Sequence, residues 1–382
     1  MKLVSVIGRN IFLLALVTLT LEVFAGTKEL DEQYGDKANH RILMVVSSYG
    51  KKQGEEQPGF EFDELAKAYL TFRDSGFEID IASPRGGKVE ADKFNAEKTY
   101  NKELLSDSQA VNKINNTRAI EVVNKSDYDA IFIVGGKGAM FDLPKNEKLK
   151  QLIAEVYQTG GVIGAVCHGP AALVNVKLKD GSYLVKGKKV NGFTNQEEKL
   201  FGKKWVKHFD FLLEDKLKER GAIFESSPMM LSHVAIDNRL ITGQNPTSTV
   251  DVARAMIGSL GGVLAKGNDY SDDMTLKLVA KIIQGDKSAL KRYRQDKNNL
   301  EPSLLGMYGF YMGMSAKSDD AIRTALQLMI IAQEDMQHPR MGLEIAKAHH
   351  KLGQVEQAKS VLNKLLKNNP EFVDAEKLLQ AL

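Results

Sequence analysis

The sequence predicts an α/β domain, in which a parallel sheet lies between helices, followed by a smaller all-α domain. Over residues 40–262, short apolar runs alternate with helical patterns, and Gly-rich turns join them. Residues 270–382 instead show consecutive amphipathic helical patterns with almost no strand signal. A chain of 382 residues is long enough for two such domains.

The elements of the first domain follow in order along the chain. The continuous apolar run over 41–48 is typical of a strand buried on both faces. A helix is expected over 62–75, ended by Gly76, and a strand over 77–82 precedes a polar excursion over 84–124. Further strands are expected over 130–134, 162–166, 189–191, 222–225, 234–236 and 240–242, with a helix over 147–159.

The end of the second domain has the pattern of a tetratricopeptide-like helix pair. Ala346 and Ala358 allow two helices to cross closely, Gly353 lies at the turn between them, and Pro370 ends the unit. An earlier pair over 304–333 has weaker spacing. Because fewer than three clear repeats are present, a plain helical bundle stays open as the alternative.

The N-terminus has the pattern of a secretory signal peptide. Lys2 and Arg9 precede a short apolar run, and small residues suited to signal peptidase follow it. We therefore predict a signal peptide over 1–25, a polar flexible leader over 26–39, and export to the periplasm or beyond the cell. The apolar run is shorter than the ~20 residues of a membrane span, which favours cleavage over an uncleaved anchor.

Composition limits the classes of partner. A net charge of +3 is too mild to argue for nucleic acid. Cys167 is the only cysteine, so it has no disulfide partner within the chain. The sequence contains no zinc-type His/Cys cluster, no P-loop and no dinucleotide motif, and His208 and His233 are isolated and expected to be structural.

The strongest chemical signal is the segment Ala165-Val-Cys-His-Gly-Pro-Ala171, which follows a buried strand and opens a helix. A nucleophile at such an elbow projects from the carboxyl edge of the sheet. The helix start is expected to favour the thiolate of Cys167. His168 could move protons, although neighbours on a turn need not face each other. Gly135 and Gly136, after the preceding strand, offer N–H donors to a substrate oxygen.

These residues resemble the ThiJ/PfpI superfamily and, more narrowly, its heat-shock chaperone and glyoxalase III-like branch. The resemblance covers residues 42–257 and implies a flavodoxin-like sheet sandwiched by helices, and a homodimer. The segments that carry it are Gly59-x4-Glu64, Phe77 to Pro84, Val134 to Asp142, the Cys167 elbow, Asn191 to Glu198 and Leu240 to Pro246.

The resemblance also implies roles within the site. Cys167 would be the nucleophile and His168 the proton carrier. Glu64 would be the acid that hydrogen-bonds the sulfur, although its position alone indicates a surface carboxylate. A protonated carboxyl there can stabilise a thiolate without adding negative charge. Glu198 would orient His168, and Glu197 competes with it for that role.

The implied reaction is a glyoxalase III-like conversion of 2-oxoaldehydes to 2-hydroxy acids through a Cys167 hemithioacetal, or a deglycase-like hydrolysis of damaged protein. Neither uses a metal, nucleotide or glutathione. Lys137 stands where relatives often carry histidine, which leaves the substrate preference open. Two other classes stay open: a stress-related holdase chaperone or redox sensor that uses the same cysteine, and an interaction module whose C-terminal helices bind a protein partner.

Overall fold

A seven-stranded sheet forms the centre of the computed structural model, which describes residues 40–202, 204–267 and 269–382. The strand order is β3-β2-β1-β4-β5-β9-β8, and every neighbouring pair is parallel except the antiparallel β8–β9 edge. The predicted flavodoxin-like fold is confirmed. The strands are β1 (Arg41–Val45), β2 (Glu78–Ser83), β3 (Arg118–Ala119), β4 (Ala130–Ile133), β5 (Val162–Val166), β8 (Val234–Asp237) and β9 (Leu240–Gly243).

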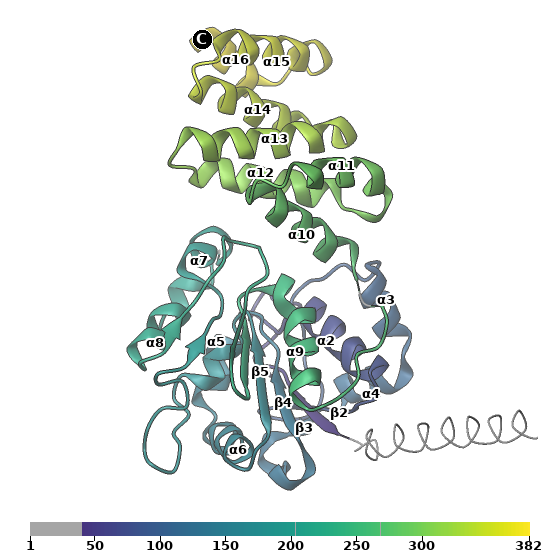
Figure 1. The fold of residues 1–382 in the computed structure, drawn as a ribbon, viewed down its shortest axis with the longest axis vertical. Coiled ribbons are helices and arrows are strands. Elements are labelled where there is room, and N and C mark those ends of the chain that lie inside the picture. Colours follow the sequence, from purple (N-terminus) through teal and green to yellow (C-terminus); the bar gives the residue numbers. More distant parts are fainter. Residues whose placement is uncertain (1–39, 203, 268) are drawn as a thin grey trace, which may run out of the picture. The chain divides into compact units, whose positions relative to one another are not determined.

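Helices cover both faces of this sheet (Figure 1). Alternate residues of β1 point to opposite faces, so Ile42 packs in the same core as α2 and α9, whereas Leu43 packs in the core that contains α6. Burial on both faces explains why this strand reads as a continuous apolar run. The helices of this region are α2 (Phe62–Asp74), α3 (Thr99–Ser106), α4 (Ser108–Asn115), α5 (Ala139–Asp142), α6 (Glu147–Gln158), α7 (Asn195–Phe201), α8 (Leu213–Glu219) and α9 (Thr249–Ser259).

The sheet differs from the sequence-based expectation in two places. The polar excursion over 84–124 contains α3, α4 and β3. Asp107 is the N-cap of α4, and its side chain accepts hydrogen bonds from the N–H groups of Gln109 and Ala110. The short strands β6 (Lys189–Val190) and β7 (Ile223–Phe224) pair with each other in a separate sheet. Apolar pattern reveals a strand, but it does not reveal the strand's partner.

The C-terminal region is all-helical, as predicted. Its apolar residues form three successive cores along the chain. In the last of these, Ala346 of one helix packs with Leu362 of the next, which is the crossing that the small residues predicted. The tetratricopeptide assignment stays a prediction. The helices are α10 (Ser271–Ile283), α11 (Lys287–Asp296), α12 (Pro302–Ser315), α13 (Asp319–Met336), α14 (Pro339–Lys351), α15 (Val355–Asn368) and α16 (Val373–Ala381).

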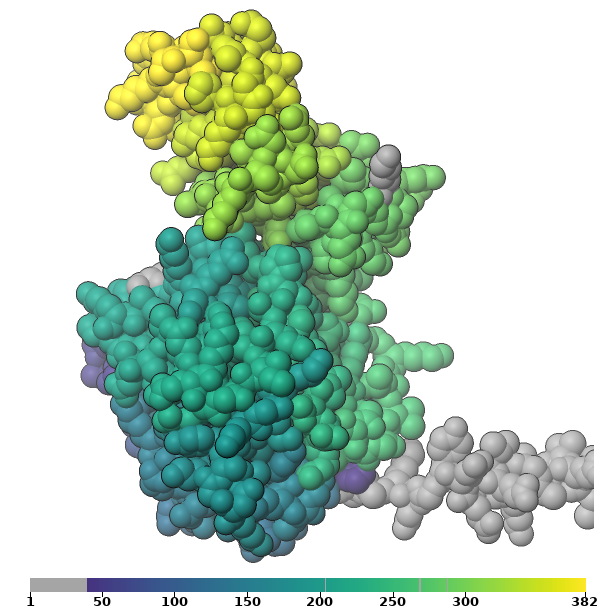
Figure 2. All heavy atoms as spheres, turned by 60° about the vertical axis from the view of Figure 1, so that its left-hand side comes forward, coloured from purple at the N-terminus to yellow at the C-terminus, as the bar shows by residue number. Residues whose placement is uncertain are grey.

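The two regions belong to one unit over 41–382 and contact each other directly. Lys67 of α2 forms ion pairs with Asp272 and Asp273 at the start of α10. Phe201 of α7 packs edge-on against Tyr311 of α12, with ring centroids 4.9 Å apart. Atoms of the green helices accordingly lie against those of the teal strand-and-helix region (Figure 2).

The predicted signal peptide (1–25) and leader (26–39) lie outside the described residues. Within the part of the chain that the structure describes, none of the helices combines the length and apolar content required to cross a bilayer. Export stays a prediction.

Candidate active site

Cys167 occupies a strained elbow between β5 and the 3-10 helix Gly169–Leu173. Its φ is +60°, a left-handed conformation that costs a residue other than glycine of order 1–3 kcal/mol. The surrounding structure enforces it: the Cys167 N–H donates to the Gly243 carbonyl at 2.9 Å, and its carbonyl accepts from Phe193 N–H at 2.8 Å. The nucleophile elbow predicted from the sequence is therefore present.

Small neighbours are required at this turn because backbones approach closely. A Cβ at Gly169 would lie 2.4 Å from the Ile133 carbonyl oxygen. One at Gly135 would lie 2.8 Å from Cys167 Cβ and 2.7 Å from Glu64 Oε2. Neither contact is sterically possible, so any larger residue would displace the cysteine or its neighbours.

His168 does face the cysteine. Its Nδ1 lies 3.4 Å from Cys167 Sγ, and its Nε2 is hydrogen-bonded to Glu198 Oε1. Both side chains of the His168–Glu198 pair are almost fully buried, and the imidazole packs on Phe193 with ring centroids 4.5 Å apart. If Nε2–H donates to the carboxylate, Nδ1 presents its lone pair to the sulfur, which is the arrangement that a general base needs.

The structure separates the two neighbouring glutamates of α7. Glu198 contacts His168, as expected from the resemblance. Glu197 forms a capping box with Thr194, and its Oε1 accepts from Met230 N–H at 2.8 Å and from Asn245 Nδ2 at 2.9 Å. Successive residues of a helix point about 100° apart, so only one of the two can reach the imidazole. Glu197 instead holds the surrounding loops together.

Glu64 is completely buried and lies behind the cysteine. Its Oε2 accepts from Gly135 N–H at 2.7 Å, while Oε1 has no nitrogen or oxygen partner among the described residues. Burial, followed by the nearby charge of Glu61, raises the pKa of the Glu64 carboxyl well above its usual range. The raised pKa favours the neutral carboxyl, and in that form Glu64 can donate a hydrogen bond to Cys167, with which it interacts.

Two features of the structure oppose what the sequence leads us to expect at this site. Burial raises the pKa of the Cys167 thiol well above its usual range, and ionisation of Glu64 would raise it further, although a hydrogen bond from Gly136 N–H lowers it. Desolvation therefore opposes the thiolate that the helix start is expected to favour, and its effect on the pKa of Cys167 is larger than that of the backbone donor. The Gly135 N–H is occupied by Glu64 and is not open to a substrate oxygen.

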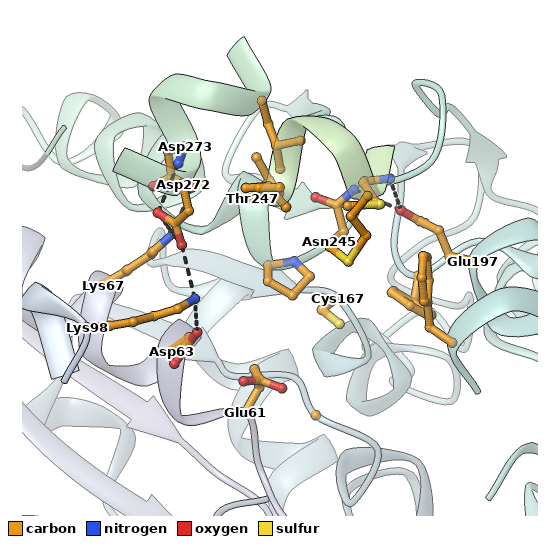
Figure 3. A pocket seen from close by; sticks show the side chains of 18 of the residues that line it. Glu61, Asp63, Lys67, Lys98, Cys167, Glu197, Asn245, Thr247, Asp272 and Asp273 are labelled. Carbon is orange, nitrogen blue, oxygen red and sulfur yellow. Dashed lines mark hydrogen bonds and ion pairs between the residues drawn. The ribbon is translucent and has the colours of Figure 1, made fainter. Parts of the chain in front are cut away.

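A cavity of about 460 Å³ opens over Cys167 and His168 (Figure 3). Gly136, Lys137 and Glu61 line it, whereas Glu64 and Glu198 lie behind the residues that do. Glu61 was not identified from the sequence. Burial, then repulsion from Asp63 and Asp92, raises its pKa to about 7, and Lys137 opposes that rise. From sequence alone, an acidic residue just before a helix is expected to face solvent, so no apolar periodicity would have revealed Glu61.

The two histidines that are isolated in the sequence, His208 and His233, do not line this cavity. His233 Nδ1 shares a hydrogen bond of 2.9 Å with Ser227 Oγ, and His208 is exposed. Across the described ranges, the structure contains no group of three or more His, Cys, Asp or Glu side chains arranged to hold a metal ion.

Comparison with known proteins gives one family and a consistent set of relatives. The model of the DJ-1/PfpI family matches residues 57–259. A "glutathione-independent glyoxalase hsp3102" of Schizosaccharomyces pombe is 32% identical over 242 residues, which are 59% of this chain and 98% of that protein.

The matches to solved structures cover a similar share of this chain. The Rapid Encystment Protein 24 kDa of Francisella tularensis is 38% identical with a TM-score of 0.55, and the match covers 58% of this chain and 99% of that one. A glyoxalase III of Candida albicans is 27% identical with a TM-score of 0.54, covering 58% and 97%. The family match ends before α10, so the helical region lies outside it.

Proposed function

This chain belongs to the DJ-1/PfpI family, and we propose that it is a cysteine-dependent enzyme that acts on reactive carbonyls without a cofactor. The observation that carries the proposal is the line of contacts from Cys167 Sγ through His168 to Glu198, with the Glu64 carboxyl on the other side of the sulfur. The relatives named glutathione-independent glyoxalase and glyoxalase III favour a 2-oxoaldehyde as the substrate.

The first step is addition of the sulfur to the aldehyde carbon. Because burial favours the thiol, the proton leaves as the C–S bond forms, and His168 Nδ1 at 3.4 Å accepts it. The carboxylate of Glu198 stabilises the imidazolium. Protonated Glu64 donates to the sulfur, which stabilises its developing negative charge. Proton return to the aldehyde oxygen gives a hemithioacetal.

The second step moves a proton between adjacent carbons. His168 removes the proton from the carbon bonded to sulfur and returns one to the neighbouring carbonyl carbon, while the proton of the hemithioacetal hydroxyl passes to the neighbouring oxygen. A thioester of Cys167 with an adjacent hydroxyl group results. Water then cleaves the thioester, so the 2-oxoaldehyde plus one water becomes a 2-hydroxy acid and the thiol is restored. Gly136 N–H, which hydrogen-bonds the sulfur and lines the cavity, could turn to an oxygen that develops negative charge beside it.

The test is turnover of methylglyoxal to lactate by the purified protein without glutathione. We expect Cys167→Ala to abolish turnover, since no other thiol is present in the chain. His168→Ala should remove most of it, whereas His208→Ala, which changes an exposed histidine outside the cavity, should leave it intact. Undiminished turnover in Cys167→Ala would exclude the mechanism.

The remaining expectations stay proposals. A homodimer, a periplasmic or secreted location, and a protein partner on the C-terminal helices rest on the resemblance and on sequence pattern. A holdase function would appear as suppressed aggregation of a heated client protein that survives Cys167→Ala. This outcome separates chaperone activity from cysteine chemistry.

A further inference from the structure

The start of α10 is fixed beside the catalytic cavity by buried charges. Lys67 Nζ lies 2.7 Å from Asp273 Oδ1 and 3.0 Å from Asp272, and Tyr100 donates to Asp272 at 2.8 Å. Lys67 is only 3% exposed, and it stands one helical turn after Glu64 on α2. The contact therefore joins the helical region to the same helix that carries the acid behind the cysteine.

Helical residues consequently form part of the cavity wall. Asp272, Asp273 and Leu276 of α10, together with Leu304 and Met307 of α12, line the same cavity as Cys167. Figure 3 shows Asp272 and Asp273 across the cavity from Glu197, with Cys167 between them. None of these helical residues falls within the family match over 57–259.

The cavity is much larger than a three-carbon substrate needs. At ~30 Å³ for each water molecule, about 460 Å³ corresponds to roughly 15 waters. Methylglyoxal fills only a small part of that space, and pockets of this size usually hold ligands several times larger. A substrate that used the whole cavity would place its aldehyde at Cys167 and a bulky tail toward the helices.

Two of the three lysines that line the cavity are already paired within the protein, and the third, Lys137, lies near the Glu61 carboxyl. Lys67 is paired with Asp272 and Asp273, and Lys98 with Asp63 at 2.9 Å. The remaining surface is dominated by apolar side chains from both regions, which are Phe193, Phe201, Met230, Leu276, Leu304 and Met307. Paired charges offer little to a charged tail, whereas this apolar surface gains free energy when a tail covers it.

We propose that α10 and α12 form the far wall of the substrate pocket and select a 2-oxoaldehyde with a bulky apolar tail, aromatic or branched. The helical region is then a determinant of specificity and part of the enzyme's own binding site. This inference rests on the proposed cysteine chemistry, because it places the aldehyde at Cys167.

The test compares kcat/KM for phenylglyoxal and methylglyoxal in the full chain. We expect the wild type to prefer phenylglyoxal by at least about tenfold, because a phenyl group buries far more apolar surface than a methyl group. Met307→Asp should lower the phenylglyoxal-to-methylglyoxal ratio at least about tenfold. Comparing the ratio between variants cancels the different intrinsic reactivities of the two aldehydes.

Met314→Asp is the matched control. Met314 is also an exposed methionine of α12 but does not line the cavity, so the ratio should not change. Leu304→Ala, a milder change in the wall, should lower the ratio in the same direction. A wild-type ratio of one or less, or a ratio that Met307→Asp and Leu304→Ala leave unaltered, would overturn the inference. Failure of the wild type to convert either aldehyde would instead count against the proposed function.

Discussion

The strand-and-helix region and the helical region are organised in opposite ways. In the first, distant segments meet: Glu64, Gly135, Cys167 and Glu198 come from four separate parts of the sequence and converge at one edge of the sheet. In the second, each helix packs mainly on its neighbours in the chain, and three small cores follow one another. Cysteine chemistry can be assembled only where a fold gathers distant residues.

The comparison teaches that the two regions acquire roles by different routes. The proposed catalytic residues depend on what surrounds them within their own region. The helical region contains no cysteine. Its contribution to the cavity comes from docking on α2 and α7. Variants in the first region should therefore change chemistry, and variants at the contact should change stability and specificity.

Among variants that keep Cys167 and His168, the largest effect is expected for Glu198→Gln. An amide cannot stabilise the imidazolium as a carboxylate does, so kcat should fall by about 10²–10⁴ while the fold persists. Steady-state kinetics with methylglyoxal, beside thermal unfolding, would measure both. Glu197→Gln is the matched comparison: it disturbs hydrogen bonds to Met230 and Asn245, so it should lower stability more than Glu198→Gln and kcat less. Equal losses of kcat would remove the distinction between the two glutamates.

Lys67→Met should destabilise the junction between the regions. The change leaves Asp272 and Asp273 buried without their main cation, and breaking such a cluster typically costs ~3–5 kcal/mol. Urea titration at pH 8 would give the loss in free energy of unfolding. Lys347→Met is the control, because its ion pair with Glu344 is solvent-accessible, unlike that of Lys67, and should contribute under ~1 kcal/mol. If both variants lose equally little, the regions are held together by their apolar contacts instead.

A smaller effect with a defined pH dependence is expected for Glu61→Gln. The folded state raises the pKa of Glu61 from 4.5 to about 7, so it binds this proton more tightly than the unfolded chain does. The contribution of Glu61 to stability is therefore lost as pH rises from about 4.5 to about 7.

Glutamine carries no such penalty, so Glu61→Gln should be more stable than the wild type at pH 8 by ~2 kcal/mol, with the difference vanishing near pH 4. Urea titrations of both proteins at the two pH values would measure this. A constant difference across the range would mean that Glu61 keeps its ordinary pKa in the folded protein.

Local pattern determined a large part of this protein by itself. Three features can be recognised from neighbouring residues alone, because burial and steric space determine which residues occur there. They are the apolar run of β1, the small residues around Cys167 and the amphipathic helices after α9. The elbow and the all-helical extension were therefore predictable. The Cys–His–Glu assignment needed the family resemblance in addition, because spacing alone could not tell Glu198 from Glu197.

Only the tertiary structure determined the contacts, the pKa shifts and the lining of the site. It directed the Gly135 N–H to Glu64, raised the pKa of the Cys167 thiol through burial, and brought Glu61, Leu304 and Met307 into the wall of the cavity that Cys167 lines. Each of these contacts and pKa shifts depends on which groups, distant in the sequence, are buried close together. That proximity is a property of the packed chain, and periodicity along the sequence does not contain it.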